Sequence, residues 1–194
     1  MRHNVAIFYL LSAATATAQV EVAVHLYDNA KTSHHLRAKA TATADRIFAA
    51  ASITIRWQSC SPVCVEDSTF PIFIIGIAGP QLEIPAQAAL GFAMLGVGQG
   101  NRAVVSVPRI EDFAEFTGTP VAIVMGHAIA HELGHLIARS NYHSTGIMTA
   151  KWGQDGAVRM TQGNMRFAPR DVEVMHKKLK ASDSKAQTPV AASN

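Results

Sequence analysis

The sequence predicts an α+β protein, with a mixed and twisted β-sheet, two long helices and a small irregular C-terminal region that ends in a helix. Three observations lead to this prediction. The chain has 194 residues, of which 48% are hydrophobic and 16% are charged, a composition typical of a globular protein large enough to bury one core. Segments of strand character alternate with long helical segments. No internal repeat or interdomain linker is visible, so we expect one domain over residues 19–180.

Residues 1–18 are predicted to be a signal peptide. The short basic start Met1–Asn4 precedes an apolar run over residues 5–11, and small residues follow, with Ala16 and Ala18 at the spacing of a cleavage site. The apolar run is much shorter than the roughly 20 residues that span a bilayer. We therefore expect a secreted or periplasmic protein that has no stable membrane association after cleavage behind Ala18.

The first half of the domain predicts three strands and one helix. Residues Val20–Tyr27 alternate apolar and polar side chains, which is typical of a half-buried strand. The segment Ser33–Ala51 is rich in alanine and has apolar residues at helical spacing, with Ser33 as the N-cap. The segments Ile53–Trp57 and Phe70–Ile77 are β-branched or aromatic and are bounded by Pro and Gly, which favours two further strands.

Glycine recurs between residues 91 and 100, before a valine-rich segment over Arg102–Ile110. The cluster has neither the Walker spacing nor the strand, G-x-G-x-x-G and helix order of a phosphate-binding loop. It therefore predicts a hairpin or an exposed edge strand, followed by another strand over Arg102–Ile110.

A long helix is predicted to follow, with Thr119 as its N-cap and Pro120 at its first position. Helical character continues to Arg139 or Ser140. This is the second of the two long helices, and it carries the most informative residues of the chain.

The C-terminal region is predicted to be mostly irregular. Glycine punctuates the stretch from Asn141 to Phe167, and Pro169 begins a last amphipathic helix. Residues 181–194 have no hydrophobic periodicity and are expected to form a disordered tail.

Two cysteines, Cys60 and Cys64, flank a turn that contains proline. In an exported chain such a pair is expected to form a small disulfide loop, because the compartment is oxidising and the turn brings the two side chains together. Two buried free thiols are the alternative. A zinc site would need two further ligands of the same kind, and the chain has no second cysteine pair.

The charge balance argues against nucleic acid as a partner. The chain has 17 basic and 14 acidic residues and a formal net charge of +3, and no segment carries a dense basic run. We expect a monomer.

The string His131-Glu132-Leu133-Gly134-His135 lies within the long helix. Residues four apart project from the same side of a helix on adjacent turns, so the two imidazoles can hold one ion. Glu132 lies about 100° around the helix, where its carboxylate can reach a water at the metal without becoming a ligand. This is the placement that a general base requires.

A catalytic zinc ion takes three protein ligands and keeps one position open. His143 follows eight residues after His135 and is the preferred third ligand. Downstream carboxylates are the alternatives, namely Asp155, Asp171 and Glu173. His127 extends the histidine stripe along the helix, but a fourth imidazole would close the open position, so we interpret His127 as a packing residue.

With Gly146-Ile147-Met148 following His143, this region resembles the metzincin clan of zinc metallopeptidases, whose pattern is H-E-x-x-H-x-x-G-x-x-H with a downstream Met-turn. The resemblance is strong over about residues 124–150. It implies a zincin-like fold and a role for Met148 as the Met-turn residue, packed beneath the ligands. It also implies that Gly91, Phe92 and Ala93 belong to the edge strand on which an extended substrate is laid.

The sequence departs from the clan pattern after His135. The glycine of the pattern falls at Ala138 and its third histidine falls at Asn141, so His143 comes two residues late. Glycine is used there because the chain must reverse through a positive φ, and asparagine tolerates that conformation better than most other residues. We therefore expect Asn141 to end the helix and His143 to be the first side chain that returns toward the metal.

The favoured function is that of a secreted zinc endopeptidase that acts on peptide or protein substrates, with Zn²⁺ as cofactor and Glu132 as general base. Two alternatives remain open. One is a catalytically inactive secreted module that binds zinc, and the other is an exported α+β protein whose helical histidines share no function.

Overall fold

The computed structural model describes residues 20–60, 70–75, 89–96 and 101–186. The predicted signal peptide over residues 1–18 lies outside the described residues, and so does Cys64. Cys60 is buried at the end of a strand. The pairing of Cys60 with Cys64 therefore stays a prediction.

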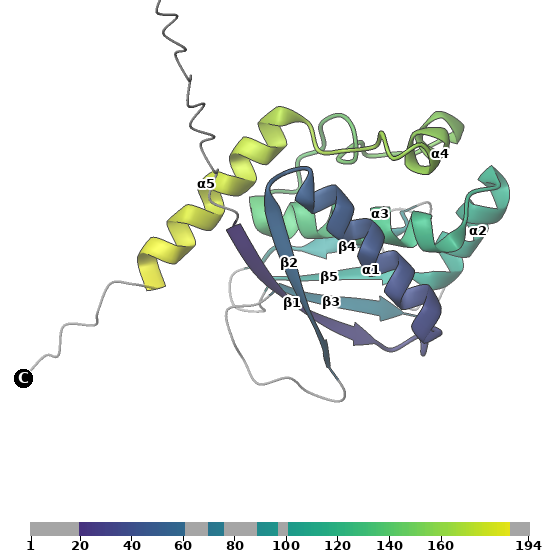
Figure 1. Cartoon of the computed structure of the whole chain (residues 1–194), viewed down its shortest axis with the longest axis horizontal. Helices are drawn as coiled ribbons and strands as arrows, with labels where there is room; N and C mark the ends of the chain where they lie inside the picture. The colour runs from purple at the N-terminus through teal and green to yellow at the C-terminus, as the bar shows by residue number, and fades with distance from the viewer. Residues whose placement is uncertain (1–19, 61–69, 76–88, 97–100, 187–194) are drawn as a thin grey trace, which may run out of the picture.

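Within the described residues, five strands form one mixed sheet, as the sequence predicts (Figure 1). In chain order they are β1 (Val20–Asp28), β2 (Ile53–Cys60), β3 (Phe70–Ile75), β4 (Gly91–Met94) and β5 (Arg102–Ser106). Their spatial order is β2-β1-β3-β5-β4, and all neighbours are parallel except β4, which pairs antiparallel with β5. The glycine-rich region thus contributes an edge strand.

Two long helices, α1 (His34–Ala49) and α3 (Val121–Ala138), run side by side and share the hydrophobic core with the sheet (Figure 1). Gly126 of α3 permits their close approach. A Cβ atom at Gly126 would lie 2.5 Å from Thr43 Cβ and 2.6 Å from the Ala40 carbonyl oxygen of α1. The absence of a side chain at this position therefore sets the distance between the two helices.

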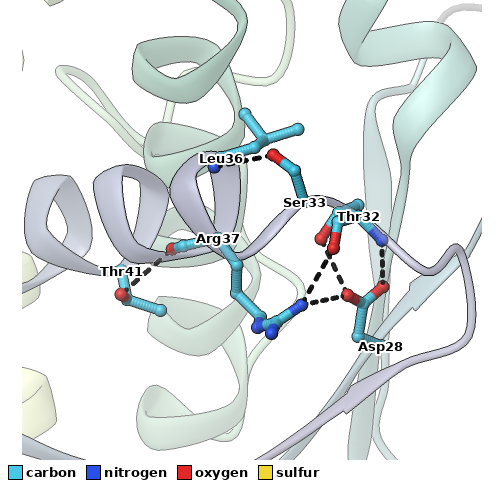
Figure 2. A network of polar contacts seen from close by, with 6 residues as sticks. All are labelled: Asp28, Thr32, Ser33, Leu36, Arg37 and Thr41. Carbon is cyan, nitrogen blue, oxygen red and sulfur yellow. Dashed lines mark hydrogen bonds and ion pairs between the residues drawn. The ribbon is translucent and has the colours of Figure 1, made fainter.

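The turn that leads from β1 into α1 is held by a polar network (Figure 2). The carboxylate of Asp28 accepts hydrogen bonds from the backbone N–H and the hydroxyl of Thr32, and pairs with the Arg37 guanidinium. Ser33 caps α1, because its Oγ accepts from the Leu36 N–H at 3.1 Å, as predicted. These contacts fix where α1 begins and hence how it lies against α3.

The core helix α3 is buried on all sides over residues 124–137. Among the described helices it has the length and apolarity of a membrane span, with a mean hydropathy of 1.4, but 78% of it is buried inside the protein. Such burial is typical of a core helix.

The predicted start of α3 is wrong by one residue. Pro120 is the N-cap, and Thr119 follows the preceding helix α2 (Val107–Thr117) and its C-cap Gly118. The Thr119 N–H donates to the Ala114 carbonyl, and the Thr117 hydroxyl donates to Thr119 Oγ1 at 3.0 Å. Thr119 therefore serves the C-terminal turn of α2.

Helix α2 itself is absent from the sequence prediction, which continued a strand to Ile110. The strand β5 ends at Ser106, and Pro108 lies in the first turn of α2. Proline lacks the N–H that a central strand needs and favours the first turn of a helix, so the valine-rich run changes structure at this point.

Two further boundaries differ at the C-terminal end. A short helix, α4 (Gln154–Thr161), interrupts the region predicted to be irregular. The last helix, α5 (Pro169–Ala186), starts as predicted but continues six residues into the predicted tail. Alanine and lysine occur near its end, and both have a high helix propensity, so they extend an existing helix at little cost. His176 of α5 hydrogen-bonds the Ala51 carbonyl at 2.7 Å, which ties α5 to the turn before β2.

Candidate metal centre

Helix α3 places His131 and His135 on adjacent turns and on one side. Both imidazoles are buried, with 8% and 4% of their surfaces exposed. Their ring centroids are 4.6 Å apart, and their Nε2 atoms face each other at 3.0 Å. The helical spacing of the sequence motif thus brings two nitrogen ligands together.

The other ring nitrogen of each histidine is held by a backbone carbonyl. His131 Nδ1 donates to the Ile147 oxygen and His135 Nδ1 donates to the Ser140 oxygen, each at 2.7 Å. Because a carbonyl can only accept, the proton of each neutral ring lies on Nδ1 and the Nε2 lone pair is free. Two lone pairs at 3.0 Å repel each other, so this arrangement favours a cation between them.

Burial keeps both rings neutral. It lowers the pKa of His131 to about 4, against the opposing effect of the hydrogen bond to Ile147, and the neighbouring His135 and His143 lower this pKa further. Burial also lowers the pKa of His135. A neutral imidazole is the form that binds a metal ion.

His143 returns from the loop after α3 and completes the cluster. Its ring stacks on His131 at 5.4 Å between centroids and meets His135 edge-on at 4.9 Å. The ligand nitrogens of the three histidines all lie within 4.8 Å of one another. His143 is exposed, whereas its two partners are buried.

The reversal of the chain before His143 differs from the prediction. The helix ends at Ala138, and Arg139 adopts the left-handed conformation, with φ 51° and ψ 47°. The N–H groups of Arg139 and Ser140 close the turn by donating to the carbonyls of Leu136 and His135. Asn141 is therefore not the residue that ends the helix, because the turn closes two residues before it.

The carboxyl group of Glu132 lies beside the edge strand β4. A Cβ atom at Gly91 would lie 3.1 Å from Glu132 Oε1 and 2.5 Å from the Val104 carbonyl oxygen. Only glycine leaves room for both groups. Glu132 is 5% exposed, and burial raises its pKa to about 8. A bound cation nearby would lower that pKa again.

The other two edge-strand residues named from the sequence follow Gly91 in β4. Phe92 pairs with Val104 and Ala93 pairs with Ala103 in antiparallel register, and both side chains are half-buried. The structure thus brings the edge strand beside Glu132.

Met148 is buried beneath α3. Its Sδ would lie 2.9 Å from a Cβ atom at Gly134, and the Phe167 ring would lie 2.8 Å from the same atom. Because Gly134 has no side chain, Met148 can pack directly against the helix turn that carries the two histidines. The turn before Met148 has Gly146 at φ 65°, and the next residue, Ile147, is the one whose carbonyl holds His131.

The remaining candidates lie outside the cluster. Among the described residues, the group that could hold a metal contains only the three imidazoles and none of the carboxylates of Asp155, Asp171 and Glu173. His127 is buried, and its Nδ1 donates to the Ile123 carbonyl at 2.8 Å, in keeping with a packing role.

Sequence reasoning missed Trp152. Its ring meets His131 edge-on, with 5.4 Å between centroids and 88° between planes. Its buried Nε1 has no hydrogen-bond partner within the part of the chain that the structure describes. Trp152 also lines a pocket of about 310 Å³ together with Lys151 and Arg159. No spacing rule marks this residue, because a loop and not a helix places it.

No family model matches the sequence, and no curated protein matches it. A solved metalloproteinase has a similar fold. It is metalloproteinase-II from Bacteroides fragilis, with a TM-score of 0.50 and 10% sequence identity. The match covers 84% of this chain and 54% of that protein, so the chain spans about half the length of its structural neighbour. At this identity the likeness concerns the fold alone.

Proposed function

We propose that the chain is a zinc-dependent metalloendopeptidase with a metzincin-like active site. The observation that carries the proposal is the cluster of three imidazole nitrogens beside a buried carboxyl group. Two ligands on a tetrahedral zinc ion lie about 3.3 Å apart when each bond is 2.0 to 2.1 Å. The 3.0 Å between the Nε2 atoms of His131 and His135 is close to that separation, so the donor set fits zinc.

The reaction assigned to this site is hydrolysis of a peptide bond. Zinc bound by the three histidines would supply Lewis acidity to the peptide carbonyl and to a water molecule. Glu132 would accept the proton that the water loses on attacking the carbonyl carbon, and would deliver it to the leaving amine nitrogen. The burial of Glu132 beside Gly91 supports this role, because the carboxyl group borders the strand expected to hold the substrate.

The outer edge of β4 supports an extended peptide as substrate. In the spatial order of the sheet β4 comes last, so one side of its backbone is not paired within the sheet. An added strand could pair there with the backbone of Gly91–Ala93. This placement would bring a scissile bond toward Glu132.

Export, disulfide formation and a monomeric state belong to the same proposal and rest on the sequence. We propose that residues 1–18 direct secretion or transport to the periplasm and that Cys60 pairs with Cys64. The N-terminus and the mass of the exported chain, measured with and without reductant, test both. A mature N-terminus other than Gln19, or two alkylatable thiols without reduction, would contradict them.

The decisive experiment for activity compares the wild type with Glu132→Gln on casein and on a peptide library. We expect one zinc per chain in both proteins and at least about a 100-fold lower turnover in the variant, since general base catalysis contributes about 10²- to 10⁴-fold. A chelator should abolish the wild-type activity and added zinc should restore it. Activity that survives both chelation and Glu132→Gln would refute the proposal. One zinc per chain without turnover would favour the inactive zinc-binding module.

A further inference from the structure

The loop over residues 139–147 carries His143 but does little to bury it. Tyr142 is 70% exposed, and His143 is exposed as well. An exposed side chain on a loop has many rotamers, and binding a metal costs the entropy of fixing one of them. The affinity of the cluster for a metal therefore depends on what fixes the loop.

Backbone contacts hold the loop at both ends. The Ser140 carbonyl accepts from His135 Nδ1 at 2.7 Å, and the Ser144 N–H donates to the Met148 carbonyl at 3.0 Å. These two contacts flank His143 on either side. Ser144 lies next to His143, and neither of these two contacts uses its hydroxyl, which lies 3.4 Å from the Thr145 carbonyl oxygen.

That hydroxyl is bound by a carboxylate from a different element. Ser144 Oγ donates to Asp171 Oδ2 at 2.6 Å. The bond is short, as expected when the acceptor is ionised, and such bonds are about twice as strong as neutral ones. Asp171 is also close enough to the cluster that its charge acts on the His135 imidazole.

Asp171 itself is held in place by α5. It lies half-buried in the first turn of this helix, where the helix dipole stabilises a negative charge, and its N–H donates to the Ala168 carbonyl at 2.9 Å. Further along α5, Met175 and Leu179 are buried in the hydrophobic core. The carboxylate is thus a fixed point to which the loop is attached.

We propose that Asp171 is a positioning residue of the metal centre, which fixes the His143 loop through Ser144 and thereby sets the affinity of the three histidines for zinc. The inference rests on the proposed function, in that it takes the histidines as the zinc ligands. It assigns to Asp171 a role different from ligation. The carboxylate is engaged by Ser144, and the proposed role is to hold the loop in place.

The test measures zinc binding by the metal-free full chain, in competition with a chromogenic chelator. We expect Ser144→Ala and Asp171→Ala each to weaken zinc binding by about 10-fold or more, the effect typical of losing a partner that orients a ligand. The double variant should bind zinc with the same affinity as the single variant of lower affinity, because both changes break the same contact between Ser144 and Asp171. Ser144→Thr keeps the hydroxyl and should restore the wild-type affinity. With cobalt(II) as a probe, the absorption spectrum of Asp171→Ala should approach that of His143→Ala.

Asp155→Ala is the matched control, since Asp155 is an exposed carboxylate in the first turn of α4. It should bind zinc like the wild type. The inference is overturned if Ser144→Ala and Asp171→Ala both bind zinc within twofold of the wild type, or if their effects multiply in the double variant. A wild type that binds zinc and cleaves peptides, with unaffected variants, would overturn this inference and leave the proposed function standing. A wild type that binds no zinc would overturn both.

Discussion

At the scale of single residues, each buried histidine of the cluster binds a backbone carbonyl with one ring nitrogen, and its other ring nitrogen faces the candidate metal site. Nδ1 of His131 and of His135 is bound to a carbonyl of the loop that follows α3, at Ile147 and Ser140. The rings are therefore oriented before any ion arrives, and both Nε2 atoms point to the same place. His143 is exposed, so it is the candidate ligand whose loss can be tested without disturbing the core.

Replacing His143 by alanine should weaken zinc binding by more than the roughly 10- to 100-fold that the loss of an orienting partner costs. The unfolding free energy of the metal-free protein should stay within about 0.5 kcal/mol of the wild type, because the side chain is exposed. Chelator competition and urea unfolding measure the two quantities. His35→Ala, which removes another exposed histidine, is the control and should change neither. Wild-type zinc affinity in His143→Ala would remove this residue from the ligand set.

At the scale of elements, the site depends on how α3 packs and on how it ends. Helix α3 is buried between α1, the sheet and α5, so the histidine pair sits on a rigid support. Its end at Ala138 decides where the loop turns back. The packing of α3 on α1 depends on Gly126, and the reversal of the chain after α3 takes place at Arg139.

Gly126→Ala should destabilise the protein by about 1–3 kcal/mol, the usual cost of overpacking a core. The added Cβ would lie within 2.6 Å of atoms in Thr43 and Ala40. This clash outweighs the gain of up to about 1 kcal/mol that alanine brings to a helix interior. Urea unfolding of metal-free protein measures the change. Gly96→Ala, where a Cβ meets nothing within 4 Å, should lie near the wild type; equal stability of the two variants would contradict the close contact.

Arg139→Gly should stabilise the protein by about 0.5–1 kcal/mol. A non-glycine residue in the left-handed region costs about 1–2 kcal/mol, and glycine regains most of this despite its larger entropy when unfolded. Arg139→Ala keeps the backbone strain and should change stability little, so it controls for the loss of the arginine side chain. Thermal unfolding with and without zinc compares the three proteins. A destabilised glycine variant would argue against the φ of 51° at this position.

At the scale of the whole molecule, the sheet and the two long helices form a scaffold against which loop and C-terminal elements complete the site. The edge strand β4 brings Gly91 to Glu132, and α5 brings Asp171 to the loop of His143. Groups far apart in the chain are therefore brought together at the site, where Glu132 and His131 are buried. Burial raises the pKa of Glu132 and lowers that of His131, so their protonation in the folded protein differs from that in the unfolded chain, and stability depends on pH.

His127 allows this dependence to be measured at one residue. Burial, the largest effect, lowers its pKa, the charge of Arg46 lowers it further, and the hydrogen bond to Ile123 opposes both. The folded protein thus binds this proton less tightly than the unfolded chain, so the contribution to stability is complete above pH 6.5 and is lost as the pH falls below it.

The glutamine variant of His127 cannot titrate and keeps an amide N–H for the Ile123 carbonyl. The unfolding free energy of His127→Gln, relative to the wild type, should therefore rise as the pH is lowered from 7.5 to about 5.5. Urea unfolding in the presence of a chelator isolates this effect from metal binding. A difference between the two proteins that is constant over this pH range would show that His127 titrates alike in the folded and unfolded states.

Much of the scaffold follows from patterns within a few residues of each other. Alternation over Val20–Tyr27 predicted β1, and the serine at position 33 predicted the start of α1. The four-residue spacing of His131 and His135 placed both on one side of α3, because a helix repeats every 3.6 residues. These predictions succeed because local backbone geometry decides them.

What the tertiary structure alone decided is which distant groups meet. The left-handed turn at Arg139 does not follow from local preference, since arginine disfavours this backbone conformation. The approach of Gly91 to Glu132 and the bond from Ser144 to Asp171 join segments separated by long stretches of chain. Periodicity carries no information on such pairs, because packing in three dimensions sets their distances. The sequence by itself therefore determined the histidine pair and its helix, and the fold decided the surroundings that make the pair a candidate metal centre.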